Sequence, residues 1–126
     1  MKRISWLVAC NLFVLCFILS CSRVGGHNLT YEVSESGTYF TIRAKYDKQQ
    51  SEEVDKFMDR YFDKYKKFSF QNTVMDATLT LEDGTGFYIK KQPGYLSIKF
   101  NKEKNSPAAY RQMKLLGERL KTVMQE

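Results

Sequence analysis

Residues 29–65, LTYEVSESGTYFTIRAKYDKQQSEEVDKFMDRYFDKY, decide the fold, because the spacing of their hydrophobic residues changes partway along. The first part alternates on either side of the Glu35-Ser36-Gly37 turn. Its inward side would carry Leu29, Tyr31 and Val33, then Phe40, Ile42, Ala44 and Tyr46. Two alternating runs around a glycine turn predict a β-hairpin. Residues 47–51 then supply helix-capping side chains, and the period changes.

The second part of this stretch predicts an amphipathic α-helix. Its apolar residues are Val54, Phe57, Met58, Tyr61, Phe62 and Tyr65. They fall at offsets of 0, 3, 4, 7, 8 and 11, which place them on one helical stripe. The other face would carry Asp55, Lys56, Asp59, Arg60, Asp63, Lys64 and Lys67. We expect this charged face to be solvated, with Glu52–Lys56 and Asp63–Lys67 ion pairs four residues apart.

Three more strands and a second helix are predicted beyond this stretch. The inward residues would be Met75, Ala77, Leu79 and Leu81 in the first of these strands, Phe87 and Ile89 in the second, and Leu96, Ile98 and Phe100 in the third. Asp83-Gly84 and Pro93-Gly94 mark the turns between them. Ser106-Pro107 would begin the last helix, whose apolar face is Ala109, Met113, Leu116, Leu120 and Val123. Residues 29–126 are therefore predicted to form one α+β domain in the order ββαβββα, an antiparallel sheet with both helices on one face.

The N-terminus has the pattern of an export signal. Lys2 and Arg3 precede an apolar run over residues 4–19, which ends in Ile18-Leu19-Ser20-Cys21. This ending is similar to the lipobox of bacterial lipoproteins, and the resemblance covers about 22 of the 126 residues. It implies that residues 1–20 are a signal peptide removed by cleavage. It also implies that the Cys21 sulfur receives a diacylglycerol and that the new amino group is acylated, for example with palmitate.

Two alternatives to lipidation concern the same segment. An uncleaved membrane helix needs about 20 apolar residues, whereas the run over residues 4–19 has 16 and includes Ser5 and Asn11. Ordinary signal-peptide cleavage needs a small residue three positions before the cut, where the large Ile18 stands. We therefore expect a lipid-anchored N-terminus and flexible tether over residues 21–28, followed by the folded domain.

Cysteine use and charge agree with an anchored, exported domain. Cys10 and Cys16 would be lost with the signal peptide, so no intramolecular disulfide is available to the mature chain. Loss of Lys2 and Arg3 lowers the formal net charge from +6 to +4, which can assist contact with anionic head groups but is not the anchor. Ser22 lacks the acidic character that retains some lipoproteins at the inner membrane, so we favour the outer membrane.

The sheet face away from the helices is the candidate binding surface. It would display Tyr39, Arg43, Lys45, Tyr88, Lys90, Tyr95 and Lys99. This mixture of tyrosine and cation suits an acidic or sugar-like envelope component, or another protein. A solvated sheet without a partner is the alternative, because tyrosine also favours strands. The export signal excludes nucleic acid as a partner.

The composition argues against an enzyme. The folded domain has no cysteine, and the only histidine, His27, lies in the tether, so neither a Cys-His nor a Ser-His arrangement can form. No metal site and no cofactor are expected, because there is no His/Cys cluster and no phosphate-binding glycine loop. We expect a non-enzymatic binding or structural lipoprotein of the bacterial cell envelope.

Other functions stay open at this point. An immunity or exclusion lipoprotein would capture an incoming factor at the membrane, and a pilot lipoprotein would assist an envelope assembly. A small hydrolase using Asp76, Glu82 or Asp83 is the least favoured of these functions, because nothing local would separate the pKa values of these carboxyl groups.

Overall fold

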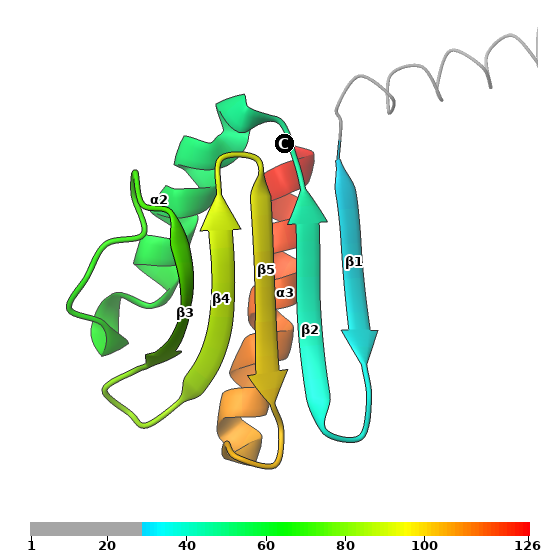
Figure 1. Cartoon of the computed structure of the whole chain (residues 1–126), viewed down its shortest axis with the longest axis vertical. Coiled ribbons are helices and arrows are strands. Elements are labelled where there is room, and N and C mark those ends of the chain that lie inside the picture. Colours follow the sequence, from blue (N-terminus) through cyan, green and yellow to red (C-terminus); the bar gives the residue numbers. More distant parts are fainter. Residues whose placement is uncertain (1–28) are drawn as a thin grey trace, which may run out of the picture.

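The computed structural model describes residues 29–126, which form a five-stranded antiparallel sheet with two helices on one face (Figure 1). The elements are β1 (Thr30–Glu35), β2 (Tyr39–Lys45), α2 (Ser51–Tyr61), β3 (Met75–Thr80), β4 (Gly86–Gln92), β5 (Tyr95–Asn101) and α3 (Pro107–Gln125). The predicted α+β class and element order are thereby confirmed. The proposed signal peptide, Cys21 and the tether lie outside the described residues.

The sheet joins two sequence-local units through one long-range pairing. The strands lie in the order β1-β2-β5-β4-β3, so the β1–β2 hairpin meets the β3–β4–β5 meander where β2 pairs with β5. This pairing runs from Tyr39 opposite Asn101 to Lys45 opposite Tyr95. The fifth strand is therefore the central strand, and α2 carries the chain from β2 across to the far edge at β3 (Figure 1).

The core lies between the sheet and the helices. Every inward residue predicted for β2, β4 and β5 is buried, and Ile42, Ile89, Leu96 and Ile98 are fully covered. Burial of each such side chain contributes about 1.5–3 kcal/mol to stability. The Phe62 ring packs against the rings of Phe70 and Phe87, which ties the end of α2 to the sheet.

The second helix, α3, begins and packs as its sequence indicates. Ser106 Oγ accepts a hydrogen bond of 3.0 Å from the Ala109 N–H, and Pro107 occupies the first turn. Gly117 lies so close to the sheet that a Cβ there would be 3.3 Å from Ile42 Cδ1. The hydroxyl of Tyr31 also donates to the Gly117 carbonyl, which fixes α3 against β1.

The first helix is shorter than its apolar stripe. It ends at Tyr61, because the backbone of Phe62 leaves the helical region (φ −100°, ψ 12°). A short 3₁₀ turn, η2 (Asp63–Tyr65), follows, and Tyr65 is 40% exposed instead of buried. The Glu52–Lys56 ion pair is present at 3.1 Å, but the predicted Asp63–Lys67 pair is wrong: Lys67 Nζ lies 3.7 Å from Glu82 Oε1 instead.

Both edges of the sheet are less covered than the alternation predicts. Val33 of β1 is 47% exposed and Ala77 of β3 is exposed, so the predicted burial of these two residues is wrong. Both residues lie on the outermost strands, which have a neighbouring strand on one side only. At the end of α3, Met124 is buried while Val123 is only half-buried. None of the described helices is both long and apolar enough to cross a membrane.

Candidate functional site

The seven residues predicted to form a binding surface lie on the sheet face that the helices leave uncovered, which is turned toward the viewer in Figure 1. We call this surface the open face. Its side chains from the three central strands are Tyr39, Thr41, Arg43, Lys45, Tyr88, Lys90, Gln92, Tyr95, Ser97, Lys99 and Asn101. Strand register, and not sequence proximity, brings them together, because they come from chain positions up to 62 residues apart.

Ser97 lies at the centre of the open face. Arg43 and Lys90 are its partners across the two adjoining strands, and Tyr95 and Lys99 are its neighbours on the same face of β5. Cross-strand partners lie about 4.5–5.5 Å apart at Cβ, and residues two apart on one strand are about 7 Å apart. A short hydroxyl side chain is therefore surrounded by three cations and a tyrosine.

The charge of the open face is mainly positive and is not neutralised within the described part of the chain. None of its four basic residues, Arg43, Lys45, Lys90 and Lys99, takes part in any ion pair among residues 29–126. Acidic residues on the same face occur only on the edge strands, as Glu32 opposite Arg43 and Asp76 opposite Lys90. A surface of this kind attracts anions.

The three tyrosines differ in their surroundings. Lys99 Nζ lies 4.3 Å from the centre of the Tyr39 ring, a cation–π contact. The Tyr88 hydroxyl donates to the Asp76 carboxylate, and this hydrogen bond raises the pKa of Tyr88. Asp76 is thus bonded to a tyrosine instead of to its cross-strand neighbour Lys90. Tyr95 lies at the other end of the face, opposite Lys45.

One end of the open face is hollowed into a cleft of about 320 Å³, which we call the Tyr39 cleft. Its lining is Tyr39, Thr78, Gly84, Gly86, Phe87, Tyr88, Lys99, Asn101, Lys104 and Asn105. Lys99 and Lys104 are the charged residues of this lining, which contains no carboxylate. The cleft therefore combines aromatic walls with positive charge.

Two asparagine side chains of this lining bond to the backbone. The Asn105 amide accepts from the Gly86 N–H at 2.9 Å and donates to the Gly86 carbonyl at 3.0 Å. Asn105 thus continues the pairing of β4 beyond the end of β5. Asn101 Oδ1 accepts from the backbone N–H groups of Glu103 and Lys104, at 2.9 and 3.2 Å. These bonds fix the backbone of the turn that carries Lys104.

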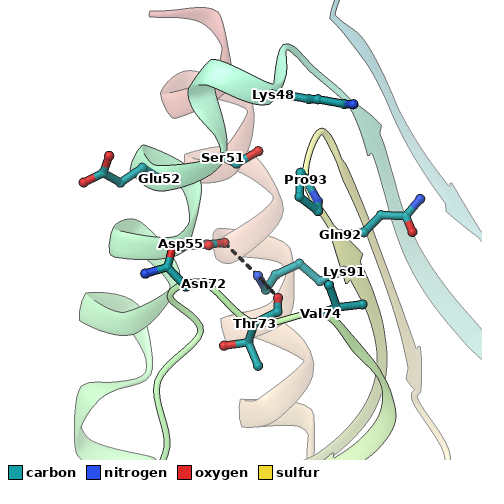
Figure 2. Close-up of a pocket in the computed structure, with 10 residues that line it drawn as sticks. All are labelled: Lys48, Ser51, Glu52, Asp55, Asn72, Thr73, Val74, Lys91, Gln92 and Pro93. Carbon is teal, nitrogen blue, oxygen red and sulfur yellow. Dashed lines mark hydrogen bonds and ion pairs between the residues drawn. The ribbon is translucent and has the colours of Figure 1, made fainter.

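A second cleft, of about 390 Å³, lies on the helix side of the sheet beside a buried ion pair (Figure 2). Lys91 Nζ is 3.0 Å from Asp55 Oδ1 and donates to the Thr73 carbonyl at 2.5 Å. Burial raises the pKa of Asp55, and the Lys91 ammonium opposes that rise. Asp55 was expected on the solvated face of α2, and this is wrong: its side chain is 9% exposed.

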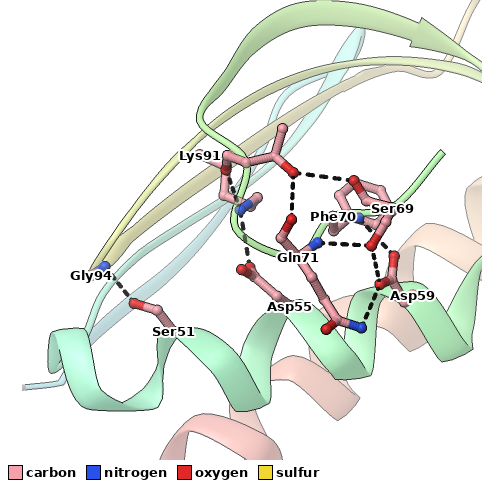
Figure 3. Close-up of polar contacts among 9 residues, drawn as sticks. Ser51, Asp55, Asp59, Ser69, Phe70, Gln71, Lys91 and Gly94 are labelled. Carbon is pink, nitrogen blue, oxygen red and sulfur yellow. Dashed lines mark hydrogen bonds and ion pairs between the residues drawn. The ribbon is translucent and has the colours of Figure 1, made fainter.

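The next acidic residue of α2 organises the loop before β3 (Figure 3). Asp59 accepts from the Phe70 N–H and the Ser69 hydroxyl, both at 2.7 Å, and from the Gln71 amide at 3.0 Å. Lys66 Nζ lies 3.0 Å from the same carboxylate. Burial raises the pKa of Asp59, but the hydrogen bonds, led by Phe70 N–H, outweigh it and lower the pKa to about 2.

Neither the Lys91–Asp55 ion pair nor the position of Lys104 in the Tyr39 cleft was predicted from the sequence. Lys91 continues the inward alternation of Phe87 and Ile89, so the period of β4 indicated a buried lysine that would need an acidic partner. No comparable signal marked Lys104, because it lies in the connection between β5 and α3. Its position follows only from the turn that Asn101 and Asn105 build.

Residues 29–126 contain no cluster of three or more histidine, cysteine, aspartate or glutamate side chains suited to a metal ion. The chain matches no protein-family model, and no curated protein or solved structure is significantly similar to it.

Proposed function

We propose that the protein is a lipid-anchored component of a bacterial envelope that binds an acidic partner through the open face of its sheet. The observation that carries this proposal is the set of four basic residues, unpaired within the described chain, interleaved with tyrosines on the one face that the helices leave uncovered. Such an arrangement offers a ligand both positive charge and flat aromatic surface, and tyrosine side chains lose little conformational entropy when they bind.

The anchor supports this role by limiting where the partner can be. The lipobox-like Ile18-Leu19-Ser20-Cys21 would attach the domain through Cys21, and seven residues, 22–28, separate this cysteine from Leu29. Seven extended residues reach at most about 25 Å. The partner is then a component of the envelope close to a membrane, the outer membrane in preference to the inner, and not a nucleic acid.

A non-catalytic role agrees with the use of the buried ionisable groups. Asp55 and Lys91 neutralise each other, and Asp59 is occupied by four donors. These groups hold α2 and the loop before β3 onto the sheet. Their environments therefore have a structural explanation and need no reaction to account for them.

The test compares charge removal on the open face with equal charge removal elsewhere. The open-face variant replaces Arg43, Lys45, Lys90 and Lys99 by glutamine. The matched control replaces four exposed basic residues of α3, Arg111, Lys114, Arg119 and Lys121, by glutamine. Both variants lose four positive charges, so they differ only in which face is altered.

Each full-length protein is then crosslinked mildly in cells, and its neighbours are identified by mass spectrometry. We expect recovery of the neighbours of the native protein to fall at least tenfold for the open-face variant and to stay within twofold for the control. Recovery should also fall as salt rises, because the contacts are ionic. Equal recovery by both variants would show that the open face is not the binding surface.

A further inference from the structure

The Tyr39 cleft has the features of a site for an anionic ring. Its lining combines two tyrosines with Lys99 and Lys104 and has no carboxylate, and its volume of about 320 Å³ is sufficient for one or two sugar rings. Small-ligand sites commonly have volumes of about 300–1,000 Å³ and a few convergent polar groups in an otherwise apolar lining. Net positive charge inside the cleft selects for an anion.

The groups that remain available to a ligand are the ring faces and the lysines. Asn105 is committed to the Gly86 backbone, and the Asn101 oxygen accepts two backbone N–H groups. The Tyr88 hydroxyl is bonded to Asp76. What is left is the Tyr39 ring with the Lys99 ammonium against one of its sides, the Tyr88 ring and the Lys104 ammonium, which suits a ligand with both a ring and a negative charge.

The position of the cleft disfavours a lipid head group. Thr30, where β1 begins, lies opposite Lys45, the last residue of β2, whereas Tyr39 is the first residue of β2, six residues earlier and at the other end of the sheet. Six strand residues span about 20 Å. Figure 1 shows the start of β1 at the top and the β1–β2 and β3–β4 turns at the bottom. A domain tethered through its N-terminus therefore carries the cleft at the end farther from its attachment.

We propose that the Tyr39 cleft binds an acidic sugar residue of an envelope polysaccharide, with the sugar ring against Tyr39 and Tyr88 and its anionic group between Lys99 and Lys104. This inference rests on the proposed function and names the ligand class of that face. Ring and charge are both required, because each contacts a different part of the lining.

The experiment titrates the full chain, purified in detergent, with four probes by calorimetry. The probes are a galacturonic acid trimer, glucose 6-phosphate, the neutral galactose trimer and inorganic phosphate. The first two carry ring and charge, as a carboxylate or as a phosphate, and at least one of them should bind at least tenfold more tightly than the last two. Equal affinity for inorganic phosphate or for the neutral trimer, or binding of neither charged sugar, overturns the proposal.

Variants locate the site. Lys99→Gln and Lys104→Gln should each weaken binding of the acidic sugar at least fivefold, whereas Lys45→Gln, on the same face but outside the cleft, should change it less than twofold. Tyr39→Ser should weaken binding, and Tyr39→Phe should retain it, because the ring and not the hydroxyl is the contact. An unchanged circular dichroism spectrum and unfolding midpoint would show that each variant is folded.

The two proposals fail in different ways. If the open-face variant loses its neighbours in cells but no acidic sugar binds, the ligand class is wrong and the binding surface stands. If the acidic sugar binds and Lys99→Gln weakens it, while the open-face variant keeps its neighbours, the cleft stands and the open face is not what holds those neighbours. Equal loss in Lys45→Gln and Lys99→Gln contradicts a site confined to the cleft.

Discussion

Gly94 links three elements at the β4–β5 turn. Its N–H donates to Ser51 Oγ at 3.0 Å, and its carbonyl accepts from the Tyr46 N–H at 3.0 Å (Figure 3 shows the Ser51 bond). Its φ of +80° lies in the left-handed region, where glycine is favoured. A Cβ at this position would lie 2.8 Å from the Tyr46 carbonyl oxygen, which is backbone and cannot swing aside.

Gly94→Ala should therefore destabilise the domain more than Gly84→Ala does. Gly84 has a similar φ of +90°, but a Cβ there would meet nothing within 4 Å. We expect about 1 kcal/mol for Gly84→Ala, from backbone strain alone, and about 3 kcal/mol for Gly94→Ala, from strain plus the clash. Urea unfolding of both variants measures the difference. Equal losses would mean that the contact with Tyr46 is not tight.

Asp59 gives stability a defined dependence on pH. Its pKa falls from 3.8 to about 2 on folding, so the folded state favours the ionised form. This stabilisation is fully present above pH 3.8 and is lost as the pH falls through about 2. Asp59→Asn should cost about 1–2 kcal/mol at pH 7, because donors from Ser69 and Phe70 lose a charged acceptor.

The cost of Asp59→Asn should shrink as the pH is lowered toward 2, which urea unfolding at several pH values would measure. Asp63→Asn is the matched control, since Asp63 is exposed and forms no ion pair within residues 29–126. A loss of stability in Asp59→Asn that is the same at pH 7 and near pH 2 would contradict the role assigned to this carboxylate.

At the scale of elements, α2 is fixed to the sheet by polar contacts as well as by its apolar stripe. Asp55 reaches Lys91 of β4, and Asp59 holds the loop that leads into β3. Both acidic residues follow the buried Val54 and Met58 directly in sequence, so they border the apolar stripe instead of opposing it. The helix end, the loop and β4 are thus joined across the cleft of Figure 2.

The Asp55–Lys91 pair should show strong coupling in a double-mutant cycle. Asp55→Leu leaves a buried lysine unpaired, and Lys91→Met leaves a buried carboxylate, so each should cost about 3 kcal/mol or more. The double variant replaces both charges by apolar groups and should cost less than the sum by at least about 1 kcal/mol. Additive losses in urea unfolding would mean that the two side chains do not stabilise each other.

At the scale of the whole molecule, the domain has two different ends. The start of β1, the β4–β5 turn and the C-terminus gather at one end (Figure 1). The Tyr39 cleft is at the other end, because its lining includes the first residue of β2 and Gly84 of the β3–β4 turn. An anchor at Cys21 would make the first end the one nearer the membrane. Two or more acyl chains hold a protein stably in a bilayer, whereas charge contacts are removed by salt.

Replacement of residues 1–21 by a signal that ordinary signal peptidase cleaves should therefore release the protein into the soluble fraction. The native chain should stay with membranes through a high-salt wash, and its mature N-terminus should be Cys21 with added acyl mass. Fractionation and mass spectrometry measure both. The open-face variant serves as control and should stay membrane-bound, because its charges are not the anchor. A native N-terminus at Met1 would contradict lipidation.

The sequence by itself determined the local elements of this protein and the composition of its open face. In a strand the side-chain direction repeats every two residues, and in a helix about every 3.6 residues. Burial of one side of β2, β4, β5 and α2 therefore appears in the sequence as a regular spacing of hydrophobic residues. Because period two assigns each strand residue to one side, Tyr39, Arg43 and Lys99 could be placed on a common face before their strands were ordered.

Only the tertiary structure decided what lies beside what. Pairing of β2 with β5 makes the last strand central, and it creates both the ring of cations around Ser97 and the Tyr39 cleft. The same packing left Val33 exposed at an edge and buried Asp55 against Lys91. Long-range strand pairing and helix placement depend on many contacts between segments that are distant in sequence. No regular spacing of residues within one segment indicates which distant segment it will contact.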